Sequence, residues 1–357
     1  MINPFRINID PMNRLLLVNI ENDPDSTYIG FEPQVFEDAV NGKGHLVIGW
    51  RKDGRVDVFH ESSLTLRPEK YNITGKGLAN IVETQFSQAF YEISSFGVQA
   101  HYEFTDILDR KIVLTVREKN PKKRKPFGLL APMGHAAESP SSMPLVFLYD
   151  FYFVRKNHTE ITIGINGRTH KPDKLPLPMD WSKMYFARYS PKPLIALLNP
   201  AFSGVVDTIK IPAVTKVFEK DGHTIHINWN QGEGPSIEKI TRVNETQPVE
   251  LCFEPAFPDL QTLPDTTHRK GRFTIKAHSS TGSIEGFYTI DKTNNIITAK
   301  LIPSLGWIPR PTKFSLRLIY GLVKIFKNWP STYEWNAVIK ETDHQNYSMQ
   351  SQWNRKG

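Results

Sequence analysis

The sequence predicts an all-β protein, predominantly antiparallel, built as two β-barrel or β-sandwich domains with one amphipathic helix near the C-terminus. Apolar residues alternate with period two over short segments that end in turn residues, which is typical of half-buried strands. Prolines outnumber glycines, 26 to 22 in 357 residues, as expected for many short strands joined by turns. Few convincing helices separate the strands, so sandwiches or barrels are favoured over alternating β/α layers.

Composition sets the remaining limits. The chain is 39% hydrophobic and 23% charged, with a formal net charge of +7, which is ordinary for a globular protein and argues against disorder and fibrous repeats. Its length predicts two domains, 1–198 and 199–357. Cys252 is the only cysteine, so an intrachain disulfide and a cysteine-based zinc site are excluded. The apolar run at 15–18 is too short for a signal peptide or a membrane span, and we expect a cytoplasmic protein.

In the first domain the strongest local signal is Asp53-Gly54, a tight-turn pair between the alternating segments 46–50 and 56–58. Further strands are expected at 98–105, 111–118, 145–155 and 159–165. The segment 78–93 fits either a helix or two strands, because its apolar residues form a helical stripe but many are β-branched or aromatic. The segment 166–193 carries five prolines and no sustained period, which predicts a long ordered loop at the end of this domain.

The second domain contains the same kind of tight-turn pair, Asp221-Gly222. Its other strands are expected at 205–211, 249–253, 272–277, 284–290, 296–302 and 333–339. Between Pro311 and Trp329-Pro330, the segment 313–328 has the pattern of an amphipathic helix with Lys313, Arg317, Lys324 and Lys327 on one stripe. Packing of this helix on a barrel wall, with its cations in water, is favoured over peripheral contact with an anionic membrane.

Candidate chemistry is sparse. The sequence contains no phosphate loop, dinucleotide fingerprint, nucleophile elbow or zincin helix, so we expect no cofactor and no metal. Asp150 interrupts the otherwise apolar segment 145–154, where its carboxylate would be costly to ionise without partners. It is therefore a candidate catalytic acid. A buried structural aspartate is the favoured alternative.

His101 and Glu103 are the other candidate catalytic residues, because they share one face of a strand and a carboxylate can orient an imidazole for proton transfer. A solvent-facing sheet surface explains the same alternation and is favoured. Residues of the proline-rich segment and its surroundings could contact a ligand at a pocket mouth. These ligand-binding candidates are Tyr152, His170, Asp180, Tyr185, Arg188 and Trp307.

The segment 119–125, KNPKKRK, holds five cations and no acid. Counterion release could drive nucleic acid onto such a cluster. It lacks interleaved aromatic residues and belongs to no nucleic-acid module. We therefore expect a solvated loop and no nucleic-acid partner.

Two β halves with a helix before the last strands resemble, in layout alone and without a shared residue motif, the twin lipocalin-like proteins. That resemblance implies a cavity for a small apolar or amphipathic ligand, which is bound and in some members transformed. A carbohydrate-active or carbohydrate-binding protein is the alternative, with Asp150 or Glu103 as one of two carboxylates about 5 to 10 Å apart across an open cleft. A non-catalytic interaction module is the third possibility, and it predicts that the protein has no deep cavity. The sequence leaves enzymatic activity, ligand identity and oligomeric state open.

Overall fold

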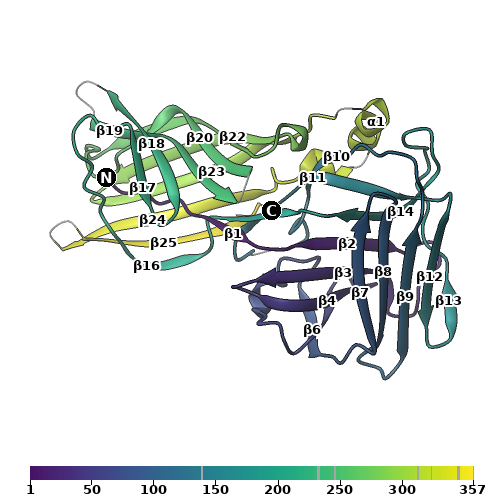
Figure 1. Cartoon of the computed structure of the whole chain (residues 1–357). Coiled ribbons are helices and arrows are strands. Elements are labelled where there is room, and N and C mark those ends of the chain that lie inside the picture. Colours follow the sequence, from purple (N-terminus) through teal and green to yellow (C-terminus); the bar gives the residue numbers. More distant parts are fainter. Residues whose placement is uncertain are drawn as a thin grey trace.

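The computed structural model describes residues 1–137, 140–230, 234–244, 247–311, 313–322, 324–343 and 346–356. Strands dominate it and lie in three sheets (Figure 1). All strand pairs in the described residues are antiparallel except β5 with β6. The predicted all-β, antiparallel class is confirmed.

The first sheet contains ten strands from the N-terminal half of the chain. Their order is β1 (Ile7–Asp10), β15 (Leu194–Leu198), β11 (Met143–Arg155), β14 (Met184–Ser190), β2 (Arg14–Asn19), β3 (Tyr28–Asp38), β4 (Gly42–Arg51), β5 (Val56–His60) and β6 (Leu78–Glu83), with β10 (Phe127–Ala131) paired to β11. Two 3-10 turns, η1 (Pro68–Lys70) and η2 (Ser279–Thr281), lie outside the sheets.

The second sheet has five strands and lies across β2, β3 and β4 of the first (Figure 1). Its order is β13 (Arg168–His170), β12 (Thr159–Ile165), β9 (Lys111–Glu118), β8 (Gly97–Thr105) and β7 (Gln88–Ser94). The segment 78–93 therefore forms two strands, β6 and β7, and not a helix.

The third sheet has ten strands and belongs to the C-terminal half. Its order is β16 (Phe202–Val206), β25 (Asn346–Arg355), β24 (Tyr333–Asp343), β23 (Ile296–Ile308), β22 (Ser283–Thr293), β21 (Thr267–Lys276), β20 (Gln247–Pro258), β19 (Gly234–Asn244), β18 (His223–Asn230) and β17 (Val217–Lys220). The expected domain boundary at 198/199 falls between β15 and β16, and independent folding of the two halves stays a prediction. Each sheet runs between two edge strands, so the described residues do not show a closed barrel or a lipocalin-like layout.

Both expected hairpin turns are present, with different backbone geometry. Asp221 and Gly222 both have positive φ, 52° and 72°, as the mirror-image two-residue turn requires. At the first hairpin only Gly54 does, with φ of 86°. There Asp53 instead accepts a hydrogen bond from the Arg55 amide at 2.9 Å, a side-chain turn that aspartate often makes.

The expectation of a long loop over 166–193 is wrong. The segment contains β13 and β14, and β14 lies inside the first sheet between β11 and β2. Ala187 and Tyr189 are fully buried on one side of β14, and Phe186 and Arg188 face the other side. Because both faces are covered, the strand lacks the apolar and polar alternation that would identify it.

Helical segments α1 (Phe314–Leu322) and α2 (Lys324–Asn328) lie in the segment expected to form a helix, and residue 323 between them is outside the described residues. If the helix packed with its cation stripe in water, Phe314 and Leu318, which lie off that stripe, would face the protein. They are instead 73% and 41% exposed. Leu316 and Tyr320 are the buried residues of α1. The apolar side of α1 is thus rotated from the predicted one. The strand expected at 205–211 ends at Val206.

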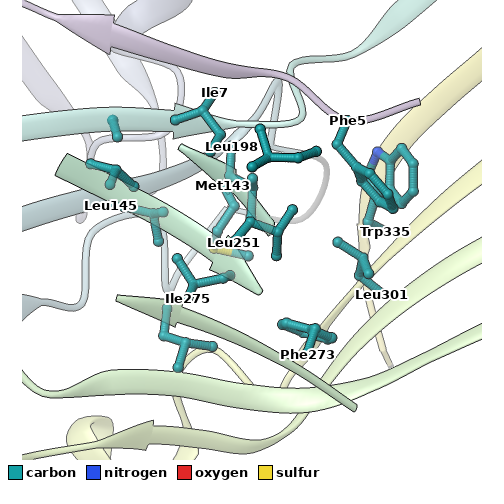
Figure 2. Close-up of a cluster of buried hydrophobic side chains, with 14 of the residues drawn as sticks. Phe5, Ile7, Met143, Leu145, Leu198, Leu251, Phe273, Ile275, Leu301 and Trp335 are labelled. Carbon is teal, nitrogen blue, oxygen red and sulfur yellow. The ribbon is translucent and has the colours of Figure 1, made fainter. Parts of the chain in front are cut away.

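Two cores hold the sheets together. Leu145 and Leu198 of the first sheet pack with residues of the third, including Leu251, Phe273 and Leu301 (Figure 2). Leu16, Val18 and Phe31 of the first sheet pack with residues of the second, including Tyr102 and Leu114. One face of the first sheet is therefore covered by the third sheet at one end and by the second sheet at the other.

His223 joins the two halves and makes their stability depend on pH. Its Nε2 atom lies 3.0 Å from both the amide nitrogen and the carbonyl oxygen of Ile7, and when Nε2 carries no proton it accepts a hydrogen bond from this amide. Burial, assisted by Arg242, lowers the pKa of His223 below 6.5 and outweighs the opposing effect of the backbone hydrogen bonds. The folded state therefore prefers the neutral ring, and this contribution is present above pH 6.5 and lost as the pH falls below it.

We expect the free energy of unfolding to fall between pH 7.5 and pH 5.5, and to fall less in His223→Gln, whose amide oxygen can accept the same hydrogen bond at both pH values. Urea unfolding at the two pH values measures this. Burial also lowers the pKa of His45 and His135, so part of the dependence should persist in the variant. An unchanged slope in His223→Gln would contradict the assignment.

Candidate functional site

The first sheet lines a partly open cavity of about 570 Å³ on the face that neither of the other sheets covers. Strands β2, β3, β4, β11, β14 and β15 line it, and segments 70–75 and 129–135 together with α1 and α2 complete its wall. Most of the lining is aliphatic or aromatic, including Leu17, Phe36, Phe151, Ile195 and Phe326.

Strand β2 shows how the sequence builds both sides of this sheet. Leu15, Leu17 and Asn19 line the cavity. Their neighbours Leu16 and Val18 point into the core under the second sheet, because successive side chains of a strand point to opposite faces. The apolar run at 15–18 is thus one strand buried on both faces.

The helices bring residues from the C-terminal half to the cavity. Leu316, Ile319 and Tyr320 of α1 line it, as does Phe326 of α2. Trp307 on β23 packs edge-on against Tyr320 and Phe326, with ring centroids 5.0 and 5.3 Å apart. Its indole donates to the Thr281 carbonyl at 2.8 Å, so Trp307 lies behind the helices as a core anchor.

Five residues form a polar cluster on the mostly apolar wall: Asn19, Glu32, Gln34, Trp50 and Arg188. Arg188 donates from Nη1 to the Asn19 side-chain oxygen at 2.7 Å, and Asn19 in turn donates to Glu21 at 2.8 Å. Within the described residues, no carboxylate forms an ion pair with Arg188. Burial lowers the Arg188 pKa to about 10, against a partial opposing effect of Glu32.

Glu32 is the acidic member of the polar cluster. Gln34 donates to its Oε1 at 2.9 Å and the Trp50 indole donates to its Oε2 at 3.1 Å. Burial raises the Glu32 pKa despite these hydrogen bonds. The wall therefore presents a carboxyl group and a guanidinium, each desolvated, and each held in place by neutral partners.

Lys70 and Asp10 form a second polar pair on the wall. Lys70 also donates to the Asn41 side chain at 2.9 Å. Because both charges of this pair are matched, we assign it to the closure of the wall by η1.

The predicted catalytic residue Asp150 is not among the cavity-lining residues. Pro144, Val146 and Leu148 of β11 face the cavity, but beyond Leu148 the lining residues are Phe151 and Phe153. A β-bulge lies at this point, where Leu129 pairs with Leu148 and Phe127 with Phe151. The extra residue changes the alternation, so Asp150 is half-buried outside the cavity wall.

His101 and Glu103 do form a pair, with His101 Nε2 and Glu103 Oε1 3.3 Å apart. They lie on the side of β8 opposite the buried residues of that strand. His101 also contacts Thr115 at 2.8 Å, and Lys111 lies 2.8 Å from Glu103 and lowers its pKa. The structure does not bring this pair to the cavity or to Asp150.

Of the predicted ligand-binding residues, Arg188 alone lines the cavity. Tyr152 stacks on Tyr189, with ring centroids 5.4 Å apart. Tyr152 and Tyr185 both pack against the core between the first and second sheets. His170 is 1% exposed, with Nδ1 2.8 Å from the Asp23 carbonyl. Asp180 lies at a loop tip and pairs with Lys313.

The sequence interpretation missed Asn19, Glu32, Gln34 and Trp50. Glu32 and Gln34 flank Pro33 in the segment FEPQVF, which favours a turn or loop. The usable signal was the same one that drew attention to Asp150: polar residues on one face of a strand whose other positions are apolar.

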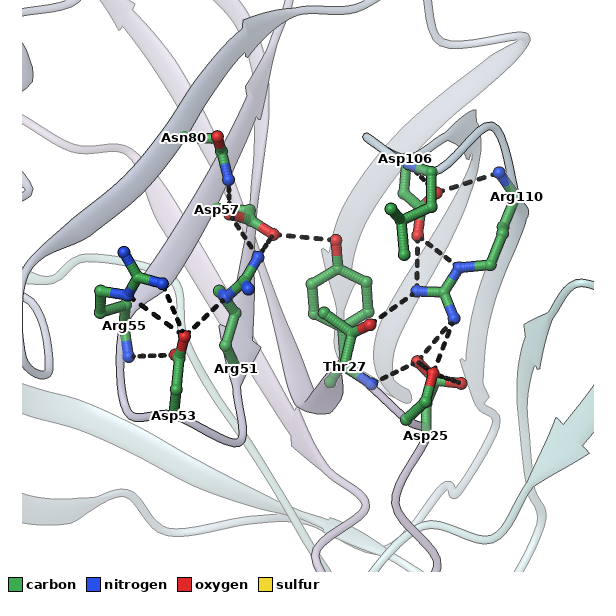
Figure 3. Close-up of polar contacts among 12 residues, drawn as sticks. Asp25, Thr27, Arg51, Asp53, Arg55, Asp57, Asn80, Asp106 and Arg110 are labelled. Carbon is green, nitrogen blue, oxygen red and sulfur yellow. Dashed lines mark hydrogen bonds and ion pairs between the residues drawn. The ribbon is translucent and has the colours of Figure 1, made fainter.

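A second group of buried carboxylates serves the fold (Figure 3). Asp57 is fully buried and accepts hydrogen bonds from Arg51 at 2.9 Å, Asn80 at 2.7 Å and Tyr28 at 3.0 Å. Nearby, Arg110 joins Asp106 and Asp25, with Nη1 2.9 Å from the Asp25 carboxylate. The Asp57 contacts join strands β3, β4, β5 and β6 of the first sheet, and Arg110 joins the turn between β8 and β9 of the second sheet to Asp25 in the loop between β2 and β3.

The chain matches no family model, no curated protein and no solved structure in the comparisons made. The described residues contain no group of three or more His, Cys, Asp or Glu side chains placed to hold a metal ion. Nor does the described part of the chain contain a helix with the length and apolarity needed to cross a membrane. The cavity is therefore interpreted from its own geometry.

Asp57→Ala should lower the free energy of unfolding by about 3 to 5 kcal/mol, because it leaves the Arg51 charge and two further donors without their buried partner. Asp53→Ala is the matched control. Asp53 is 40% exposed and pairs with the same arginine, so its loss should cost less than about 1 kcal/mol. Urea unfolding measures both, and equal losses would contradict the structural assignment.

Proposed function

We propose that the chain binds one small apolar or amphipathic molecule in the cavity of the first sheet. The observation that carries the proposal is a mostly apolar cavity of about 570 Å³ with the polar cluster on its wall. Ligand sites typically have about 300 to 1,000 Å³ and an apolar lining with a few polar groups.

The size of the cavity argues against a packing defect. Voids in protein cores are few and rarely exceed the size of a water molecule. A space of about 570 Å³ is far larger than such voids and falls within the range of ligand sites.

The polar cluster supports a ligand with an oxygen-bearing end, such as a carbonyl or carboxylate. Arg188 has five N–H donors, and within the described residues it donates to the Asn19 side chain and to the Phe186 carbonyl. The remaining donors can bind acceptor atoms of a ligand. Glu32 is already bound by Gln34 and Trp50 and serves as the acceptor on the same wall.

The alternatives receive less support. Asp150 and Glu103 lie outside the cavity, and the indoles of Trp229 and Trp307 are bonded to the carbonyls of Thr215 and Thr281. Three other carboxylates, those of Asp10, Glu21 and Glu32, do line the cavity, but each accepts a hydrogen bond from a neighbouring side chain of the wall. The Trp50 indole beside them is bonded to Glu32, so the pair of carboxylates expected for sugar chemistry would have to give up these partners. A pure interaction module would not need the cavity.

Filling the cavity should abolish binding. Leu17 lies on β2 opposite Arg188 and lines the cavity, so Leu17→Trp should weaken binding of the neutral probe N-phenyl-1-naphthylamine at least about ten-fold. Leu17→Ala enlarges the cavity and should retain binding. Fluorescence titration measures both, and native mass spectrometry of gently purified protein checks for a co-purified ligand.

A tryptophan on the outer surface provides the size control. Val243 is 57% exposed on β19, so Val243→Trp should leave probe binding unchanged. No saturable probe binding by the wild-type chain, with no co-purified molecule to explain it, would refute the proposed function.

Removal of the Arg188 guanidinium should weaken the binding of anionic ligands only. In Arg188→Gln we expect binding of the fatty acid cis-parinaric acid to weaken roughly 10- to 100-fold, because a hydrogen bond to a charged group is lost. The neutral probe should bind as before. Competition titrations with both ligands measure this.

Asp150→Asn is the matched control, since it removes one charge from the neighbouring strand β11 without changing the cavity wall. It should leave both affinities unaltered. A loss of binding in Asp150→Asn and none in Arg188→Gln would move the ligand's polar contacts from the polar cluster to Asp150.

A further inference from the structure

The outer face of α1 combines cations with exposed apolar side chains. Phe314 and Leu318 lie one turn apart and are 73% and 41% exposed. Lys313 and Arg317, also one turn apart, share this side of the helix, with the Arg317 amide bonded to the Lys313 carbonyl. Lys324 and Lys327 extend the exposed cations along α2. Apolar groups between cations are typical of helices that lie at a membrane surface.

A tight turn places a tryptophan in water beside this helix. Met179 and Ser182 exchange both backbone hydrogen bonds, at 3.0 and 2.9 Å. Between them Asp180 and Trp181 have positive φ, 50° and 60°, where asparagine and glycine are preferred. Trp181 is 99% exposed. A tryptophan at this position is unfavourable both for the backbone and for its exposed ring.

The turn, the helix and the basic segment 119–125 meet at one place. Lys313 pairs with the Asp180 carboxylate and lies over the Phe127 ring. Lys122 donates to the Asp180 carbonyl at 3.1 Å. We call the exposed residues gathered here the basic apolar patch: Lys122, Trp181, Phe314, Arg317, Leu318 and Lys324.

The charge of the patch is one-sided. Segments 119–127 and 313–328 contain no aspartate or glutamate, and the Asp180 carboxylate is engaged by Lys313. A surface with unbalanced cations attracts an anionic partner. Exposed tryptophan and phenylalanine favour the boundary between water and acyl chains.

We propose that the basic apolar patch docks the protein on the surface of an anionic lipid bilayer, with Trp181 and Phe314 inserted among the headgroups. An opposite side of α1, with Leu316 and Tyr320, lines the cavity. Docking therefore brings a wall of the cavity against the lipid. Binding to the bilayer does not depend on the proposed ligand function, and either can fail without the other.

The bilayer is favoured over nucleic acid because the patch carries aliphatic as well as aromatic groups. Leu318 and Phe314 lie on the same helix face as Arg317. Bases stack on aromatic rings, but an exposed leucine between cations gains more from acyl chains.

The experiment is co-sedimentation of the full chain with vesicles of phosphatidylcholine alone and of phosphatidylcholine with phosphatidylserine at about 30%. We expect binding to the anionic vesicles, weakening as salt is raised. Arg317→Glu with Lys324→Glu should reduce binding at least about ten-fold. The control pair, Lys210→Glu with Lys340→Glu, makes the same charge change at exposed residues outside the patch and should bind the anionic vesicles at least several-fold more tightly than the patch variant.

Trp181→Gly separates docking from folding. Glycine suits the positive φ of this turn, so the melting temperature should rise by roughly 2 °C, whereas vesicle binding should fall at least several-fold. Brominated phospholipid should quench tryptophan fluorescence in the wild type and not in Trp181→Gly. Trp181→Phe should retain most of the binding.

Three results would overturn the proposal. One is absence of binding to the anionic vesicles at about 0.1 M salt. Another is an equal loss in the patch and control charge variants. The third is tight binding of a single-stranded oligonucleotide through the patch by a chain that leaves the vesicles unbound.

Discussion

The curvature of the first sheet is the constraint on which the rest of the structure depends. Its strand β2 is apolar on both faces between residues 15 and 18, with Leu16 and Val18 on one side and Leu15 and Leu17 on the other. The second and third sheets both cover the outer face. Sheets pack about 10 Å apart face to face. In the described residues, neither of the other two sheets lies against the inner face. The inner side chains therefore surround a cavity.

The helix pair closes the structure where the sheets do not reach. Trp307 of the third sheet holds α1 and α2 through Tyr320 and Phe326, and the Tyr320 hydroxyl reaches back to the Gly128 carbonyl at 2.7 Å. The C-terminal half thereby supplies one wall of a cavity built mainly by the N-terminal half. One face of α1 lines the cavity, with Leu316, Ile319 and Tyr320, and the other faces water. The cavity face accounts for these apolar residues of the helix.

The sequence was informative where only one face of a strand is buried. In β8 the alternation of Val98, Ala100 and Tyr102 with polar neighbours matches the observed burial. It misled where both faces are covered, as in β14, because alternation vanishes there. Because of a single β-bulge in β11, Phe151 faces the cavity in place of Asp150. Nothing in the local sequence marks that bulge, which depends on pairing with β10.

The Asp57 network and the polar cluster on the cavity wall differ in how their charged groups are paired. Around Asp57, carboxylate, guanidinium, amide and hydroxyl satisfy one another, as a structural network must. In the polar cluster, Arg188 and Glu32 are both desolvated but are held mainly by neutral partners. Apolar residues of similar size would serve stability as well or better at such positions. Arg188 lines the cavity, bonded to Asn19 and to the Phe186 carbonyl and stacked on the Phe186 ring, and its further N–H groups are the donors on which the proposed ligand site depends.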